Sequence, residues 1–403
     1  MRVLIADKFS ADGKATLATM GLHIEDRPEL GADDIPAALQ ASGAEILVVR
    51  STEVRAEVFA AAPTLSLVIR AGAGVNTIDL AAAGRHGVFV ANCPGKNAIA
   101  VAELTMGLML ALDRNIPDAV AELRAGRWDK KRFGKARGLC GSRLGLVGFG
   151  AIAREVAVRA QSFGMRVHAF DVALTDADAA AHDVVRASSL EEVLRTCDVI
   201  SVHVPYIKGR THHLLGEEEL ALMKDGATLI HTSRGGVVDD TALAAAVASG
   251  RIRAGLDVYE GEPAEGKAQW QGPVLEVAGV YGTPHIGAST TQAEDAIAEE
   301  VVRIVRDYVA QGVVHNCVNV QRPRGEGCTV VIRHLDRVGV LAAVLDAFQK
   351  EDLNVQEMQN VIFDGRAAAS ATITLAREPS PELVARLQTR DDILAVSVRV
   401  GTR

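Results

Sequence analysis

The stretch LGLVGFGAIAREVA (residues 144–157) decides the fold of this chain. Its apolar start predicts a strand, and Gly148 with Gly150 predicts a tight turn directly before a helix. The spacing is that of the fingerprint G-x-G-x-x-G with Ala153 in the third position, where a small residue packs the helix against the strand. The stretch therefore predicts a turn that binds the pyrophosphate of a dinucleotide at a helix N-terminus.

An acidic residue in the next strand supports this interpretation. Asp171 follows the apolar run MRVHAF (165–170), about twenty residues after the glycines, as the fingerprint requires. A carboxylate there accepts both ribose hydroxyls and repels a 2′-phosphate, so the cofactor is expected to be NAD rather than NADP. The alternative is a glycine-rich turn without a ligand, and the strand, the helix and the acid together argue against it.

Short apolar runs alternate with helical patterns on both sides of the turn, which is typical of parallel sheets covered by helices. The first unit lacks the fingerprint, and its strands are expected in MRVLIA (1–6), EILVVR (45–50), LSLVIRAG (65–72) and GVFVANC (87–93). The second unit carries the fingerprint, and its strands are expected in RLGLVGF (143–149), MRVHAF (165–170), VISVHV (199–204), ATLIHT (227–232) and GLDVY (255–259). An apolar helix over 98–112 is either central core or a subunit interface.

The last eighty residues have a different pattern. QRPRGEG (321–327) is expected to be a linker. The elements expected beyond it are strand 328–333, helix 338–350, strands 354–361 and 367–375, helix 381–388 and strand 393–400. The order βαββαβ predicts a ferredoxin-like domain with an antiparallel sheet.

Composition excludes several classes of protein. The chain has 403 residues, 48% of them hydrophobic, and a formal net charge of −8, which makes nucleic acid an improbable partner. Its five cysteines are scattered without a CxxC pair, so neither a disulfide framework nor a metal site is expected, and a reducing cytoplasm is favoured. The start MRVLIADKF enters a strand at once, so no signal peptide is expected. The apolar run LTMGLMLAL (104–112) is too short to span a membrane.

Three side chains near expected strand ends are suited to the chemistry of a 2-keto acid. Ligands of open α/β sheets lie beyond the carboxyl ends of the strands, so Arg234, Glu262 and His285 could face one cleft. A guanidinium grips a carboxylate, histidine exchanges a proton near neutral pH, and a carboxylate orients the histidine. Taken singly, an arginine after a strand, a glutamate before a proline and a lone histidine are more often structural.

The ordered motifs VVRSTEV, RAGAGVNTIDL, NCPGKNAIAVAEL, LGLVGFGAIAREVA, SVHVP, TSRGGVVDD, LDVYEGEP and TPHIGAST resemble the D-isomer-specific 2-hydroxyacid dehydrogenase family. The resemblance implies that Arg234 binds the substrate, that His285 is the acid and base, and that Glu262 is its carboxylate partner. It implies two Rossmann-like, doubly wound parallel-sheet domains, the cofactor domain being inserted in the substrate domain. The bounds expected are 1–97 with 288–318 for the substrate domain, 98–287 for the NAD-binding domain and 327–403 for the C-terminal domain.

The resemblance also implies a set of residues that bind NAD, in the fingerprint and at the ends of the neighbouring strands. These are Gly148, Phe149, Gly150, Ala151, Ile152, Asp171, Val204, Pro205, Thr232, Ser233, Asp257 and Gly287.

A second set is expected to read the substrate. Arg50, Arg70 and Arg132 match pocket positions of relatives that act on phosphorylated hydroxyacids, and converging guanidinium groups suit a phosphate. Backbone amides near Gly74 and Val75 are expected to bind the substrate carboxylate. The alternatives are dispersed surface charges and an ordinary strand-end turn.

The C-terminal domain resembles an ACT regulatory domain, on the pattern VIRHLDRVGVL (331–341). The resemblance implies that His334, Asp336 and Asn354 contact an amino-acid effector such as serine. Asp336 stands where serine-sensitive relatives carry asparagine, and its charge could attract the ammonium group or repel the carboxylate of serine. A domain that serves only dimerisation is the alternative.

The function expected is NAD-dependent oxidation of a phosphorylated D-2-hydroxyacid. One alternative is a reductase of glyoxylate or hydroxypyruvate. An alternative of another class is an NAD-sensing corepressor, because the family includes such binding proteins. A homodimer or homotetramer is expected, with the helix that starts at Ala98 at the interface.

Overall fold

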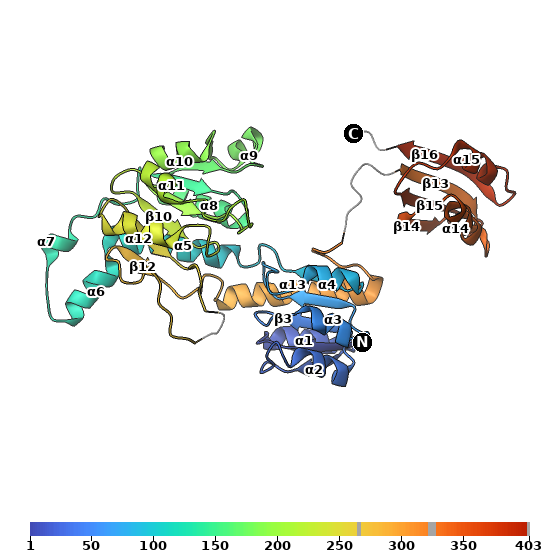
Figure 1. Cartoon of the computed structure of the whole chain (residues 1–403), viewed down its shortest axis with the longest axis horizontal. Coiled ribbons are helices and arrows are strands. Elements are labelled where there is room, and N and C mark those ends of the chain that lie inside the picture. The colour runs from blue at the N-terminus through green and yellow to red at the C-terminus, as the bar shows by residue number, and fades with distance from the viewer. Residues whose placement is uncertain (264–266, 321–327, 401–403) are drawn as a thin grey trace. The chain divides into compact units, whose positions relative to one another are not determined.

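The computed structural model describes residues 1–263, 267–320 and 328–400 (Figure 1). The chain forms two compact units, Met1–Asn319 and Val320–Arg403. The first unit holds two parallel sheets and the second a small antiparallel sheet. The linker expected over 321–327 lies outside the described residues. The α/β fold class with an additional C-terminal domain is confirmed, whereas the exact domain bounds stay predictions.

The first sheet has the strand order β2-β1-β3-β4-β5, and all its pairs are parallel. Its strands are β1 (Arg2–Ile5), β2 (His23–Asp26), β3 (Ile46–Val49), β4 (Leu67–Arg70) and β5 (Phe89–Asn92). Its helices are α1 (Ala11–Thr19), α2 (Ile35–Ser42), α3 (Ala56–Ala61), α4 (Leu80–Arg85) and α13 (Thr291–Gln311). The order is that of a doubly wound sheet, which needs helices on both faces.

Alternating side chains divide the core of this sheet into two layers. Leu47 belongs to the layer that packs against α2, α3 and α4. Its neighbours Ile46 and Val48 belong to the layer under α1 and α13. All four residues of β3 are aliphatic and buried between the two layers, which explains why the strand reads as a continuous apolar run. Helix α13 therefore returns the chain to the first sheet after the second sheet is complete.

The second sheet has seven parallel strands in the order β12-β11-β10-β9-β6-β7-β8. They are β6 (Arg143–Val147), β7 (Arg166–Phe170), β8 (Val185–Arg186), β9 (Val199–Val202), β10 (Thr228–His231), β11 (Arg253–Leu256) and β12 (Val280–Gly282). The helices of this part are α5 (Ala98–Arg114), α6 (Ile116–Arg124), α7 (Lys130–Phe133), α8 (Ala151–Ser162), α9 (Asp176–Ala181), α10 (Leu190–Thr196), α11 (Glu217–Leu222) and α12 (Asp240–Ala248). This is the Rossmann order extended by one strand, and its order reverses between β6 and β9.

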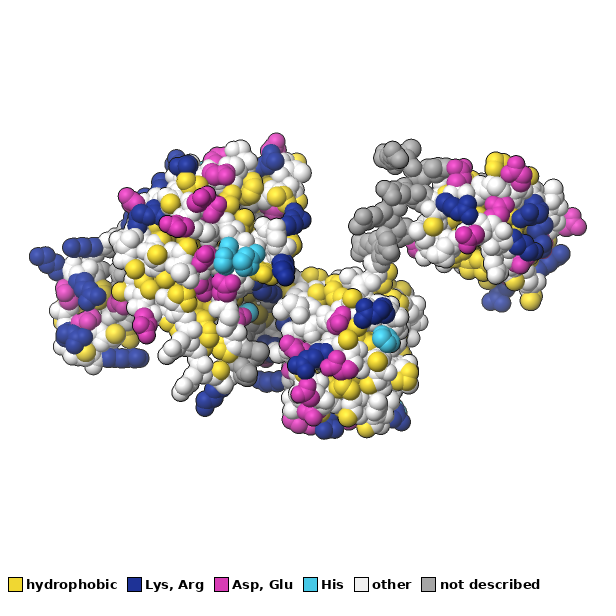
Figure 2. Space-filling model, in the orientation of Figure 1, with side chains coloured by type: hydrophobic (Ala, Val, Ile, Leu, Met, Phe, Trp, Pro, Cys, Tyr) yellow, Lys and Arg dark blue, Asp and Glu magenta, His cyan; other side chains and the backbone are white. Residues whose placement is uncertain are grey.

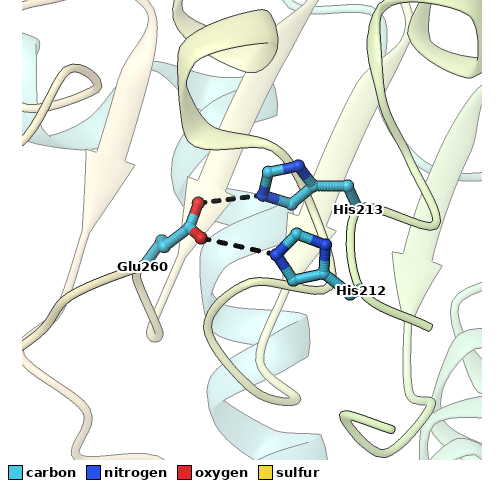
Figure 3. A group of neighbouring side chains, drawn as sticks. All are labelled: His212, His213 and Glu260. Atoms are coloured by element: carbon cyan, nitrogen blue, oxygen red, sulfur yellow. Dashed lines mark hydrogen bonds and ion pairs between the residues drawn. The ribbon is translucent and has the colours of Figure 1, made fainter. Parts of the chain in front are cut away.

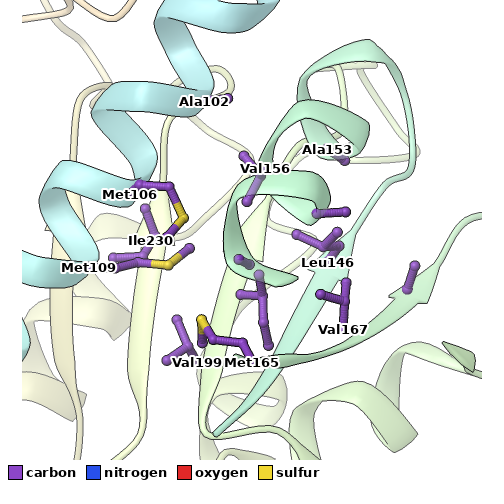
Figure 4. Packing of buried hydrophobic residues seen from close by; sticks show 14 of the residues in the cluster. Ala102, Met106, Met109, Leu146, Ala153, Val156, Met165, Val167, Val199 and Ile230 are labelled. Atoms are coloured by element: carbon purple, nitrogen blue, oxygen red, sulfur yellow. The ribbon is translucent and has the colours of Figure 1, made fainter. Parts of the chain in front are cut away.

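Helix α5 contributes to the core of the second sheet. Figure 4 shows Met106 and Met109 of α5 beside Ile230 of β10, with Val156 of α8 in the same cluster. Nine of its side chains are buried within the single chain. Within the chain α5 packs against α8, β10 and β11, and the expected role of its remaining exposed residues in a dimer interface stays a prediction.

The C-terminal unit has the expected order βαββαβ. Its elements are β13 (Cys328–Leu335), α14 (Val340–Lys350), β14 (Val355–Ile362), β15 (Ala368–Leu375), α15 (Pro381–Gln388) and β16 (Ile393–Val400). The antiparallel sheet has the order β14-β15-β13-β16, with the first and third strands of the unit at its centre. This is the ferredoxin-like arrangement. In the described part of the chain, no helix is long and apolar enough to cross a membrane.

Candidate active site

The fingerprint turn has the geometry that a pyrophosphate requires. Gly148 adopts a φ of 90°, and a Cβ atom there would lie 2.9 Å from the backbone of His203, so this position requires glycine. Nothing lies within 4 Å of a Cβ built on Gly150, which leaves open space over the start of α8. Gly150 caps α8 without a side-chain bond, so its first N–H groups remain available to an anion. Ala153 is fully buried in the core.

Asp171 closes the turn from the next strand. One carboxylate oxygen accepts the N–H of Phe149 at 2.9 Å, and the other accepts the N–H of Ala173 at 2.8 Å. Each oxygen retains a lone pair for a hydroxyl group, since a carboxylate offers about four acceptor sites. The open helix end and the placed acid fit the pyrophosphate and the ribose of NAD.

His285 and Glu262 form a close pair. His285 Nδ1 lies 2.5 Å from Glu262 Oε1, and Glu262 Oε2 accepts the N–H of Tyr259 at 3.2 Å. Because the carboxylate accepts from Nδ1, the neutral ring presents the lone pair of Nε2 to a substrate. His285 has a φ of 52°, a conformation that non-glycine residues rarely adopt and that occurs often at functional sites.

Asp257 holds the segment that carries this histidine. Its Oδ1 atom accepts from the hydroxyl of Thr283 at 2.6 Å and from the N–H of Ile286 at 2.8 Å, and its Oδ2 atom accepts the N–H of Gly287 at 2.8 Å. The aspartate is buried beyond the end of β11. These bonds assign it a role in fixing His285, and its expected contact with the cofactor stays a prediction.

Three arginines, Arg50, Arg70 and Arg234, lie near one another in the first unit. Burial lowers the pKa of Arg70, and the neighbouring charges of Arg234 and Arg50 lower it further. Among the described residues, Arg70 Nε is buried and finds no acceptor. The side chain of Arg234 lies against Gly74, and its Nη1 atom donates to the carbonyl of Ser233 at 2.6 Å. This concentration of positive charge suits an anionic ligand.

A cavity of about 1080 Å³ is lined by residues from both sheet-containing parts of the first unit. Its walls include the expected residues Gly74, Val75, Ile152, Val204, Pro205, Ser233, Arg234 and Glu262. Glu262 also lines an adjoining cavity of about 650 Å³ together with His285. Gly235 lies close to the carbonyl of Tyr259, since a Cβ atom built on Gly235 would be 1.9 Å from that oxygen. The loop that carries Arg234 therefore lies against the loop that carries Glu262.

Two of the expected site residues, Arg132 and Thr232, make other contacts within the single chain. Arg132 stands exposed on α7, where its guanidinium lies 3.8 Å from Glu122 and over the ring of Phe133, so within a single chain it does not join Arg50 and Arg70. Thr232 is buried, and its hydroxyl lies 3.0 Å from that of Thr105 on α5 rather than on the cavity wall.

The structure also reveals supporting residues that the sequence patterns did not single out. The carboxylate of Asp7 accepts the N–H groups of Arg50, Ser51 and Thr52 at 2.6, 3.0 and 3.0 Å, which fixes the loop after β3. Asn92 donates to the carbonyl of Ala73 at 2.6 Å and braces the expected anion loop. In the sequence, the only sign of Asp7 and Asn92 was their position at the ends of the apolar runs MRVLIAD and VFVAN.

The expected effector residues are not gathered in the C-terminal unit. His334 is 2% exposed on β13, where Nδ1 lies 2.8 Å from the carbonyl of Leu335 and Nε2 lies 3.2 Å from the side-chain oxygen of Asn360. A contact between His334 and an effector is therefore not supported, because its ring is enclosed and both nitrogens have partners. Asp336 and Asn354 lie at strand ends, and their role stays a prediction.

The chain is similar to known proteins over the residues that build this site. Residues 106–287 match the model of the D-isomer specific 2-hydroxyacid dehydrogenase, NAD binding domain. A hydroxypyruvate reductase of Thermotoga maritima is 42% identical over 64% of this chain and 82% of its own length. The chain belongs to the D-isomer-specific 2-hydroxyacid dehydrogenase family.

Two further members of the 2-hydroxyacid dehydrogenase family are similar to the chain. A D-3-phosphoglycerate dehydrogenase of Methanocaldococcus jannaschii is 39% identical over 78% of this chain, which spans 59% of that relative's length. The D-lactate dehydrogenase of Aquifex aeolicus, solved with NAD and lactic acid, superposes with a TM-score of 0.64 at 32% identity, over 77% of this chain and 96% of its own. The family's NAD-binding domain includes the fingerprint turn, so NAD is the cofactor.

Proposed function

We propose that the chain catalyses the NAD-dependent oxidation of D-3-phosphoglycerate to 3-phosphohydroxypyruvate, the entry reaction of serine synthesis. The observation that carries this proposal is that Arg70 lies near both Arg50 and Arg234, while Arg234 lines one cavity with Glu262, the partner of His285. The arginines suit a ligand with two anionic groups, and the pair suits proton transfer. The relatives named D-3-phosphoglycerate dehydrogenase support the choice of substrate.

Each group has a task in this reaction. Arg234 grips the substrate carboxylate, and the N–H groups of Gly74 and Val75, which find no acceptor in the part of the chain that the structure describes, help to bind it. His285 Nε2 removes the proton of the C2 hydroxyl, and Glu262 stabilises the resulting imidazolium. NAD, when bound, accepts the hydride that leaves C2.

Phosphate recognition falls to Arg50 and Arg70. Arg50 Nη1 lies 2.7 Å from Glu294 Oε1, and this bond holds its side chain in place, while the guanidinium of Arg70 lies against Gly72 with its Nε atom free of a described acceptor. A phosphate accepts paired N–H donors from guanidinium groups better than from any other side chain.

Reduction of hydroxypyruvate is the second candidate. One observation favours it: Glu294 partly neutralises Arg50, which leaves less positive charge for a phosphate. The similarity to the hydroxypyruvate reductase of Thermotoga maritima agrees with this alternative. A corepressor without catalysis has less support, because binding alone would not need the close pair of His285 and Glu262.

The proposal also covers how the chain assembles, whether an effector regulates it and where in the cell it acts. We place a homodimer contact on α6, which carries no buried side chain, rather than on α5. An amino-acid effector would bind in the C-terminal unit, where Asp336 and Asn354 lie at opposite ends of the sheet and would each contact a different molecule. The cysteines are free, which suits the reducing cytoplasm.

The direct test is the oxidation of NADH by the purified chain with 3-phosphohydroxypyruvate, hydroxypyruvate and glyoxylate in parallel. A preference for the phosphorylated acid of about 100-fold in kcat/KM, or about 2.7 kcal/mol, supports the proposal. An equal or reversed preference would identify the enzyme as a general reductase of hydroxyacids. No turnover with any of the three would overturn both candidates.

A further inference from the structure

His212, His213 and Glu260 form a cluster outside the proposed chemistry (Figure 3). His213 Nε2 lies 3.0 Å from one carboxylate oxygen of Glu260, and His212 Nε2 lies 3.8 Å from the other. Each residue offers one ligand atom, and all three atoms lie within 4.8 Å of one another. Figure 2 shows histidine side chains gathered at one spot of the surface beside acidic ones, so an ion could reach them from solvent.

The backbone that presents these side chains is fixed by hydrogen bonds. Thr211 donates through its hydroxyl to the carbonyl of Pro205 at 2.6 Å and accepts the N–H of Ile207 at 2.6 Å. The N–H of His213 donates to the carbonyl of Gly236 at 2.8 Å. On the opposite side, the N–H of Glu260 donates to Asp240 at 3.0 Å. A ligand would therefore meet a site that is largely preformed.

A second carboxylate stands behind one of the rings. Asp239 Oδ2 lies 3.6 Å from Nδ1 of His213, on the side of the ring away from Glu260. The other oxygen of Asp239 accepts the N–H groups of Thr241 and Ala242 at the start of α12, so this carboxylate is held in place. Histidines that bind metals usually donate their second ring nitrogen to such an outer carboxylate, which orients the ring and raises its basicity.

The donor set selects a class of ion. Two imidazole nitrogens and one carboxylate oxygen suit zinc or a neighbouring late transition metal, whereas magnesium and calcium prefer oxygen ligands alone. Bonds of about 2.1 Å in tetrahedral geometry separate the ligand atoms by roughly 3.4 Å, between the two distances observed here. The rings stack with centroids 3.9 Å apart and 20° between their planes, so the exposed ring of His212 must turn to aim its lone pair at the same ion.

We propose that His212, His213 and Glu260 bind one divalent transition-metal ion of the zinc class, with Asp239 as the outer carboxylate. The site joins the segment 205–213 to the loop that also carries Glu262. Glu260 and Tyr206 both line the larger cavity, so the ion would fasten two parts of its wall. The site takes no part in the proposed hydride and proton transfers, and its test does not depend on them.

The test is a calorimetric titration of the full chain, freed of any affinity tag and of metal, with zinc chloride. We expect one ion per chain, and an affinity weaker by at least about tenfold in the double variant His212→Asn/His213→Asn and in Glu260→Gln, since even outer ligands contribute 10- to 100-fold. His182→Asn is the matched control, because His182 also faces one carboxylate, that of Asp178 at 3.7 Å, yet stands apart from the cluster. This variant should bind zinc as the parent chain does.

Two further readouts make the result decisive. Cobalt(II) bound at the site should give visible d–d absorption bands that the double variant lacks, and magnesium should not compete with zinc. Melting curves without metal verify that each variant is folded. Zinc binding that survives the double substitution would overturn the proposal, and so would the absence of binding at 100 µM zinc or equal affinity for magnesium.

Discussion

The contact between His285 and Glu262 is the one on which the proposed chemistry depends most. The two residues are 23 positions apart in the chain, and their side chains meet at 2.5 Å because Asp257 and Tyr259 hold the two loops. Either residue alone has an ordinary structural explanation. The meeting of the two atoms turns a resemblance in sequence into a geometry that can move a proton.

Replacing Glu262 by Gln should lower kcat/KM by about 10²- to 10⁴-fold, because an amide cannot stabilise the imidazolium that forms on His285. The pH dependence of kcat/KM should change with it, which a purely structural role would not produce. Steady-state rates from pH 6 to 9 measure both effects. The variant Glu218→Gln, which removes an exposed carboxylate on α11, should match the parent chain. An unchanged pH profile in Glu262→Gln would argue against the pair.

The sequence could predict the side chains of the proposed chemistry, and it could not predict several of those that hold their loops in place. Arg234, Glu262 and His285 follow strands and fall in recognisable motifs. Asp7 gives no such signal, because its partners lie more than forty residues further along the chain. A short basic run does not reveal which way its helix faces, and the expected role of Arg132, exposed on α7, stays a prediction.

The turn between β6 and α8 assigns different tasks to its two glycines. Gly148→Ala should destabilise the fold by about 1–3 kcal/mol, since the methyl group meets the backbone of His203 and the φ of 90° disfavours it. Gly150→Ala should leave stability unchanged and weaken NAD binding, because its methyl group fills only the space left for the pyrophosphate. Urea unfolding and NADH fluorescence titration separate the two effects. Equal stability of the two variants would contradict this division.

Helix α13 is tied to its surroundings by a buried carboxylate. The guanidinium of Arg303 is the main cause that lowers the pKa of Glu300 to about 2, and Asn316 and Lys96 add to the effect. A carboxylate whose pKa is depressed on folding stabilises the folded state above its ordinary pKa, and the stabilisation is lost as the pH falls through 4.5 towards 2.

Glu300→Gln should therefore cost on the order of 2–3 kcal/mol of unfolding free energy at pH 7. The difference between parent and variant should shrink as the pH falls from 5 to 3. Urea unfolding at pH 7, 5 and 3.5 measures the trend. A difference that stays constant down to pH 3.5 would show that the charge of Glu300 is not what stabilises α13.

Long apolar runs were predictable as strands, and short or polar ones were not. β2 is an edge strand of sequence HIED with little burial, and β8 and β12 contain only two and three residues. β11 was expected over 255–259 but covers Arg253–Leu256. The apolar run continues beyond Leu256, but the strand ends there. The next residue, Asp257, bonds to the segment that carries His285 and not to a neighbouring strand through its side chain.

Helix α6 stands off the second sheet (Figure 1). Its exposed apolar side chains are those of Ile116, Val120 and Leu123. Leu123→Glu should shift the chain towards monomers, because a charge in an apolar contact is costly to bury. Light scattering after size exclusion measures the mass. Val158→Glu is the control, since Val158 of α8 is 56% exposed against 55% for Leu123. Equal masses for both variants and the parent would place the interface elsewhere.

The parallel and antiparallel kinds of sheet followed from the order of the patterns along the chain. The sequence could not say which surface a second copy of the chain would cover. An apolar helix is compatible with core and with interface, and the packing around α5 shows its contribution to the core. The amphipathic face of α6 is too short to stand out among the surface helices.

The specificity ratio between 3-phosphohydroxypyruvate and hydroxypyruvate, measured in Arg50→Gln and in Arg55→Gln, tests the central claim most directly. Arg55 follows Arg50 closely in the chain but pairs with Asp33 and Glu53 at the surface. If Arg50 and Arg70 bind the phosphate, the ratio of kcat/KM values should fall at least about tenfold in Arg50→Gln, a loss of about 1.4 kcal/mol. The ratio should stay unchanged in Arg55→Gln. An unchanged ratio in both variants would contradict the claim that this cleft reads a phosphate.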